Sequence, residues 1–74
     1  MSAKAFIESD PEKLGGTLVF AGTRVPVKNL FDYLETGETL ETFLEDFPTV
    51  SRGQALGVLD ASMKSLLTTY ESAA

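Results

Sequence analysis

A helix-stop signal and a helix-start signal lie close together in the second half of this 74-residue chain. Pro48 ends a preceding helix, because the residue before a proline is pushed out of the α-helical region. Shortly after it, Ser51 and Gln54 have the spacing of a capping box. In this motif the two side chains accept hydrogen bonds from backbone N–H groups that the first turn leaves unpaired. The sequence therefore predicts two helices joined by a short turn.

Apolar residues recur at spacings of three and four on both sides of this turn and also before it, which is the pattern of amphipathic helices. Pro26 suits the first turn of a helix, where its missing N–H costs nothing. Gly37 suits the left-handed position just after a helix end. We predict three helices, over residues 26–37, 39–47 and 51–69.

The first third of the chain has the composition of short strands and turns. An apolar run at residues 5–7 and a β-branched, aromatic run at 17–20 are typical of strands, and 23–25 is expected to return after the turn Ala21-Gly22. We therefore predict a short β-hairpin within residues 5–25. The expected fold is a single domain over residues 1–74, mainly α with a short N-terminal β-hairpin and a three-helix helix-turn-helix core of homeodomain-like or winged type.

The chain contains no cysteine and no histidine. Disulfides and the usual zinc ligands are therefore absent, as are the residues of common nucleophilic triads. A core of this size rarely supplies more than ~3–5 kcal/mol without a further staple, and oligomerisation is the staple left open. We expect a homodimer with no enzymatic activity, no metal, no cofactor and no small-molecule substrate. The absence of a signal-peptide pattern and of a long apolar run leads us to expect a cytoplasmic protein without membrane contact.

The predicted third helix begins with residues that are able to read DNA. In a helix-turn-helix, the N-terminal residues of the second helix reach the base edges. Here these are Ser51, Arg52 and Gln54, and arginine and glutamine make bidentate contacts to guanine and adenine. The alternative is that Ser51 and Gln54 only cap the helix and that Arg52 is a solvated charge. A net charge of −5 weighs against nucleic acid and favours a protein partner.

Small residues recur in the third helix at Gly53, Gly57 and Ala61. A glycine inside a helix costs ~0.8–1 kcal/mol relative to alanine. This cost indicates that another group approaches the backbone closely. The group is either a neighbouring part of the chain or a partner, and the sequence leaves both open.

The same helix carries an apolar stripe at spacings of three and four, made of Leu56, Leu59, Met63, Leu66 and Tyr70. Such stripes usually face a core. In a small domain, however, a long helix extends beyond the elements that would cover it. We therefore predict that the C-terminal part of the stripe forms a dimer interface like a coiled-coil seam. The predicted interface residues are Met63, Leu66, Leu67 and Tyr70.

Carboxylates gather around the first two predicted helices, and Glu38, Glu41 and Glu45 share one face. Paired acids serve in acid–base chemistry or metal binding, but a solvated acidic face is the more ordinary interpretation. If this face has a function, it would dock a basic protein by charge complementarity. We therefore assign Glu38, Glu41 and Glu45 as partner-binding residues.

An ordered set of motifs runs through the chain: the Asp10-Pro11 turn, "GTRVPV" at 22–27, Gly37 and "ETLETFLEDFP" at 38–48. With these motifs, residues 6–67 resemble the domain-of-unknown-function 433 family. The resemblance implies a β-hairpin followed by a dimeric helix-turn-helix core. It also implies an antitoxin that neutralises a PIN-like ribonuclease toxin and regulates its own operon by binding operator DNA. The alternative is an acidic protein-interaction module that binds a partner protein without DNA.

Two further basic residues, Arg24 in the recognised motif and Lys28 just after it, join the predicted DNA-binding set. Arg24 also has a structural alternative. It would pair with Asp32 or Glu35 on the following helix and anchor the hairpin, leaving no role at a DNA phosphate.

Overall fold

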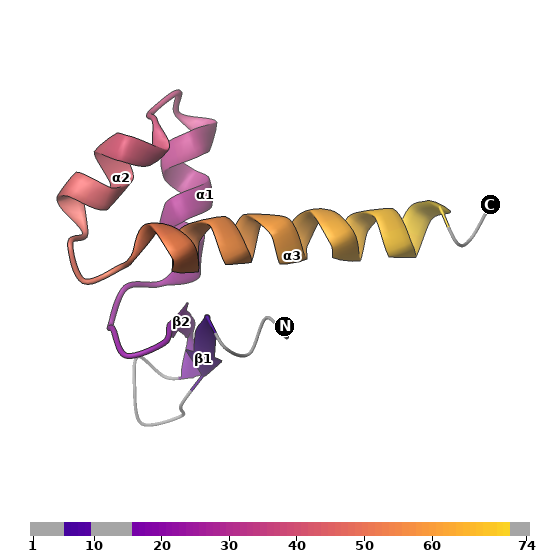
Figure 1. Ribbon diagram of the computed structural model, residues 1–74, viewed down its shortest axis with the longest axis horizontal. Helices are drawn as coiled ribbons and strands as arrows, with labels where there is room; N and C mark the ends of the chain where they lie inside the picture. Colours follow the sequence, from indigo (N-terminus) through magenta and orange to yellow (C-terminus); the bar gives the residue numbers. More distant parts are fainter. Residues whose placement is uncertain (1–5, 10–15, 72–74) are drawn as a thin grey trace.

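The computed structural model describes residues 6–9 and 16–71 and consists of a small hairpin and three helices (Figure 1). Strands β1 (Ile7–Ser9) and β2 (Leu18–Phe20) precede helices α1 (Val27–Glu35), α2 (Leu40–Asp46) and α3 (Arg52–Glu71). The predicted fold class, mainly α with an N-terminal hairpin before three helices, is confirmed. The predicted helix bounds are correct to within about two residues at each end, as expected where helix ends fray.

The hairpin differs from its predicted arrangement. β1 pairs antiparallel with β2, with Ile7 opposite Phe20, whereas residues 23–25 do not form a strand. Thr23 instead closes a tight turn: its Oγ1 donates to the carbonyl of Phe20 (2.8 Å) and accepts from the amide of Val25 (3.0 Å). Thr23 is buried by this role, so its side chain is used in the turn rather than on a sheet face. The predicted strand residue Ala5 and the Asp10-Pro11 turn lie outside the described residues.

Local capping sets the helix ends where the sequence predicts them. Thr39 Oγ1 accepts from the amide of Thr42 (3.1 Å) and so begins α2. Gly37 has φ +89°, a left-handed conformation that a side chain disfavours. Its amide donates to the carbonyl of Leu34 (3.2 Å), which ends α1 and turns the chain toward α2. These turns orient α1 and α2 so that their apolar faces meet.

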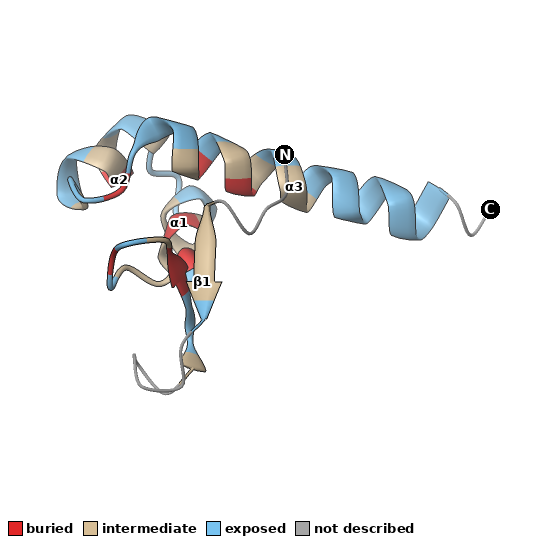
Figure 2. Ribbon diagram, turned by 60° about the horizontal axis from the view of Figure 1, so that its bottom comes forward, coloured by how far each residue is buried: buried red, intermediate tan, exposed pale blue. Residues whose placement is uncertain are grey.

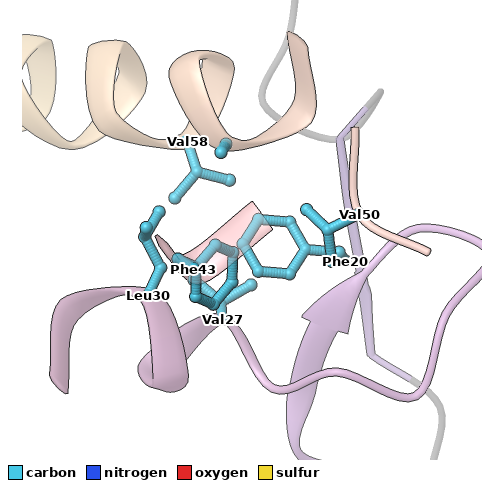
Figure 3. Packing of buried hydrophobic residues seen from close by; sticks show 7 residues of the cluster. Phe20, Val27, Leu30, Phe43, Val50 and Val58 are labelled. Carbon is cyan, nitrogen blue, oxygen red and sulfur yellow. The ribbon is translucent and has the colours of Figure 1, made fainter. Parts of the chain in front are cut away.

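The core lies where α1, α2, the start of α3 and strand β2 converge (Figure 3). Phe20, Leu30 and Phe43 are fully buried there. The ring centroids of Phe20 and Phe43 lie 5.9 Å apart, within the range of favourable aromatic contacts. The complete buried cluster comprises Phe20, Val27, Leu30, Phe43, Val50, Ala55 and Val58. Ala55 and Val58 are the members of this cluster that come from α3, so the helix packs against the core through its N-terminal half.

The reason for one glycine of α3 is visible in the fold. A Cβ atom at residue 57 would come within 2.7 Å of the Phe6 ring, closer than real side chains allow. Gly57 therefore admits the segment before β1 against the helix, which makes the close approach intramolecular at this position. A Cβ at Gly53, in contrast, would meet nothing nearer than Ser51 Oγ at 3.8 Å.

The second half of α3 extends beyond the other elements. The hairpin, α1 and α2 all lie against its N-terminal half, and the C-terminal turns project away from them (Figure 1). Figure 2 shows these last turns as exposed over their whole circumference. Half of the longest helix therefore contributes little to the core of the chain.

Candidate nucleic-acid interface

The connection between α2 and α3 leaves the tip of α3 open to solvent. Ser51, Arg52 and Gly53 are all exposed. The predicted capping box is formed: Ser51 Oγ accepts from the amide of Gln54 (3.0 Å), and Gln54 Oε1 accepts from the amide of Ser51 (2.9 Å). α2, a short connection and α3 thus follow one another as a helix, a turn and a helix with an exposed second tip.

Gln54 does not have a free side chain for reading a base. Besides its capping bond, its Nε2 donates to the carbonyl of Ala21 (2.9 Å) in the turn after β2. Both ends of the amide group are therefore used inside the chain. This differs from the base-reading role predicted for Gln54. The structure instead gives the residue the task of tethering the hairpin to α3.

Arg52 reaches back to α2. Its Nη2 donates to the carboxylate of Glu41, and both side chains stay more than half exposed. The hydrogen bond, supported by the charge attraction, lowers the pKa of Glu41 and raises that of Arg52. A cation predicted to contact nucleic acid and an acid predicted to contact a partner are thus bound to each other. No local signal in the sequence announces a contact between these two helices.

The other two predicted DNA-binding cations differ in their surroundings. Lys28 pairs with Asp32 one turn later (2.9 Å), and this hydrogen bond with its charge attraction raises the pKa of Lys28. The sequence left open that Arg24 pairs with Asp32 or Glu35 on α1. The structure shows neither ion pair. Arg24 is exposed and has no ion pair with any residue in 6–9 or 16–71. It lines a hollow of about 630 Å³ that reaches Thr49 in the α2–α3 connection.

The predicted partner-binding acids are all exposed, but they do not share one helix. Glu41 and Glu45 are on α2, whereas Glu38 precedes the helix in the connection after Gly37. Sequence reasoning missed a nearby polar contact, in which Tyr33 Oη donates to Asp46 (2.7 Å) and the pKa of Tyr33 is raised by this bond. Glu38 and Asp46 both line a shallow hollow between the ends of α1 and α2.

The predicted dimer residues are exposed. Met63, Leu66, Leu67 and Tyr70 retain 50, 58, 45 and 72% of their accessible surface. Of the whole apolar stripe of α3, only Leu59 packs against the core, and Leu56 is 47% exposed. The core-facing side of the helix is instead formed by smaller residues, among them Ala55 and Val58.

Within the described segments, no three acidic residues are grouped so that they could hold a metal ion. None of the helices in the same segments is both long and apolar enough to span a bilayer.

Comparisons with known proteins agree with these motifs. A sequence model of the family described as protein of unknown function DUF433 matches residues 7–60, which run from β1 into the middle of α3. The protein y4eO of Sinorhizobium fredii (strain NBRC 101917 / NGR234), an uncharacterized protein, is 39% identical over 49 residues. This similarity covers 66% of the present chain but only 22% of the longer relative. No solved structure matches the chain. Because the family model covers the hairpin, α1, α2 and half of α3, this chain belongs to the DUF433 family.

Proposed function

We propose that this protein is an antitoxin-type, helix-turn-helix DNA-binding protein whose α3 tip contacts operator DNA. The observation that carries the proposal is the position of two arginines beside the α2–α3 connection. Arg24 lines a hollow with Thr49 of the connection, and Arg52 begins α3 directly after it. Phosphate and base contacts from the start of a helix require such a solvent-exposed tip with cations beside it.

The first turn of α3 adds donors to these cations. Ser51 occupies only the amide of Gln54. The amides of Arg52 and Gly53 lie in the first turn, where a helix provides no carbonyl partner. Gly53 leaves the backbone there uncovered, since a Cβ atom at this position would have Ser51 Oγ, at 3.8 Å, as its nearest neighbour. Backbone N–H groups at the start of a helix favour a phosphate oxygen.

The number of cations sets the expected salt dependence. Arg24, Lys28 and Arg52 are the basic residues proposed to meet phosphates in each chain. The logarithm of the affinity falls with the logarithm of salt concentration by about 0.9 for each phosphate neutralised. A slope of about −3 per bound chain is therefore expected, shallow for a DNA-binding protein and consistent with a net charge of −5.

Fluorescence anisotropy with the DNA upstream of its own gene tests this proposal, at low and at moderate salt. Arg52→Ala and Arg24→Ala should each weaken binding and reduce the salt slope by about one. Lys64→Ala is the matched control, because Lys64 is an exposed cation on α3 that pairs with Asp60, away from the tip. Undetectable binding at low salt, or equal losses in all three variants, would contradict the proposal.

The antitoxin role adds a protein partner. The exposed acids Glu38 and Glu45, joined by Glu41 when its pair with Arg52 opens, would attract a basic surface. A ribonuclease toxin of PIN-like type provides one, because its RNA-binding groove must be cationic. Co-purification of the chain with the product of a neighbouring ribonuclease-like gene tests this part separately from DNA binding.

A second function, a protein-interaction module that does not bind DNA, is favoured by a different observation. Four basic residues lie in the described segments, and three of them are neutralised by acids: Lys28 by Asp32, Arg52 by Glu41 and Lys64 by Asp60. Under this function, Glu38→Lys combined with Glu45→Lys abolishes partner binding. The tip variants of α3 then have no effect on any ligand.

A further inference from the structure

We infer that the exposed stripe of α3 binds the same stripe of a second copy, with the two helices antiparallel and a twofold axis at Met63. The α3 stripe is defined here as Leu56, Leu59, Met63, Leu66 and Tyr70, with Leu67 at its edge. Its members alternate at spacings of three and four, the pattern of a seam made for another helix. A seam that faced its own core would be buried, but here every member except Leu59 is exposed.

The charges of α3 indicate why the partner is a second copy. Each chain carries a net charge of −5, so two copies repel each other except where the surface is neutral. Between residues 56 and 70 the charged side chains are Asp60 and Lys64, and they pair with each other (2.9 Å). This neutral stretch is a surface on which two acidic chains approach without placing unpaired carboxylates together.

The same argument selects the antiparallel direction. α1, α2 and their connection lie at the N-terminal half of α3 (Figure 1), and this part of the chain carries Asp32, Glu35, Glu38, Glu41, Glu45 and Asp46. In a parallel pair, both acidic ends would meet side by side. In an antiparallel pair, each acidic end lies beside the projecting half of the other helix, where residues 65–70 carry no charge and Glu71 is the one acid, so fewer carboxylates face each other.

The stripe is also symmetric in sequence about Met63. An axis at this residue places Leu56 of one copy opposite Tyr70 of the other and Leu59 opposite the Leu66–Leu67 pair. A twofold interface requires such self-complementarity, because each contact occurs twice. The groove of about 420 Å³ beside Leu66, lined also by Leu18 and Phe31, continues this apolar surface toward the hairpin and α1.

This arrangement fixes the distance between the two α3 tips. Arg52 lies eleven residues before Met63, so at about 1.5 Å per residue the two arginines stand about 33 Å apart along the helix axes. One turn of B-DNA separates half-sites by about 34–36 Å. The match to the DNA repeat rests on the proposed function, whereas the dimer itself does not.

Sedimentation equilibrium of the full chain tests the seam. The unmodified chain should have the mass of two copies, and Met63→Glu, which places two carboxylates at the axis, should have the mass of one. Thr68→Glu is the matched control, since it adds the same charge to the opposite side of α3, and it should keep the mass of two. Tyr70→Glu at the end of the seam repeats the test if Met63→Glu is unfolded by circular dichroism. A single-copy mass for the unmodified chain, or equal dissociation by Thr68→Glu, would overturn the inference.

A distance measurement tests the direction. The chain contains no cysteine, and the position of Gly53 has open space, so a nitroxide on Gly53→Cys is a unique probe at the tip. Pulsed electron–electron double resonance should give one distance of about 30 Å between the two nitroxides. Each label lies ten residues from the axis at Met63, at about 1.5 Å per residue. A distance below about 20 Å means parallel helices and overturns the arrangement. A dimer with the expected distance that binds no DNA would remove the proposed function and leave this inference intact.

Discussion

The carboxylate of Glu41 on α2 accepts a hydrogen bond from the guanidinium of Arg52 at the start of α3. The sequence predicts that Glu41 binds a protein partner and that Arg52 binds DNA, so this contact couples the two predicted surfaces. A basic partner that binds Glu41 would release Arg52, and DNA that binds Arg52 would release Glu41. The two ligands would then favour each other's binding, since each removes the competing intramolecular pair.

Replacing Glu41 with glutamine should strengthen DNA binding. The substitution removes the charge that neutralises Arg52, and the gain is modest because solvent screens an exposed ion pair of this kind. The expected gain is about two- to fivefold in affinity at low salt, measured by anisotropy. Glu45→Gln is the control, since it removes a carboxylate from the same helix that forms no ion pair with any residue in 6–9 or 16–71. An equal gain in both variants would mean that only net charge matters.

Glu41 should titrate below the ordinary range of a glutamate. Its pKa is lowered in the folded chain, chiefly by the hydrogen bond from Arg52. The pair therefore contributes to stability above the pKa of Glu41 in the unfolded chain, and this contribution is lost as pH falls through the folded pKa. Carboxyl-carbon NMR should show the midpoint rising in Arg52→Ala. A midpoint that does not move between the two proteins would show that Arg52 is not the cause.

Gly57→Ala should destabilise the chain although alanine is the better helix former. The new methyl group collides with the Phe6 ring, which lies within 2.7 Å of its position. Overpacking of this kind costs about 1–3 kcal/mol, measured by urea unfolding. In a Phe6→Ala background the collision is absent, so the same substitution should stabilise by about 0.8–1 kcal/mol. Gly53→Ala, where space is open, should stabilise in either background. A Gly57→Ala variant that is stabilised with Phe6 present would contradict this packing.

Gln54→Glu should separate the two tasks of this side chain. A glutamate still accepts from the amide of Ser51, so the capping box survives. It cannot donate to the carbonyl of Ala21, so the tether to the hairpin turn is lost and two oxygens face each other. We expect a loss of about 1–3 kcal/mol, against about 1 kcal/mol for Ser51→Ala, which removes only the cap. Faster hydrogen exchange of the Ala21 and Thr23 amides in Gln54→Glu would locate the change. Unchanged exchange there would show that the tether has no role in stability.

Much of the local structure is determined by the sequence alone. Pro48, Thr39, Gly37 and the Ser51–Gln54 box each act within one turn of backbone, so the helix ends can be read from neighbouring residues. The three helices, the hairpin strand at Leu18–Phe20 and the exposed start of α3 follow from such short-range rules. The stripe on α3 also follows from spacing, because a helix places residues three and four apart on one face.

The tertiary structure alone decides which of these groups meet. Thr23 closes a turn instead of extending a strand, because its hydroxyl donates a hydrogen bond to the carbonyl of Phe20. Gln54 binds Ala21 across 33 positions of sequence, and Arg52 binds Glu41 rather than standing free. A residue type and its neighbours limit what a side chain is able to do. Which partner it takes depends on how the helices pack, because an exposed polar group binds the nearest complementary group that the fold brings within reach.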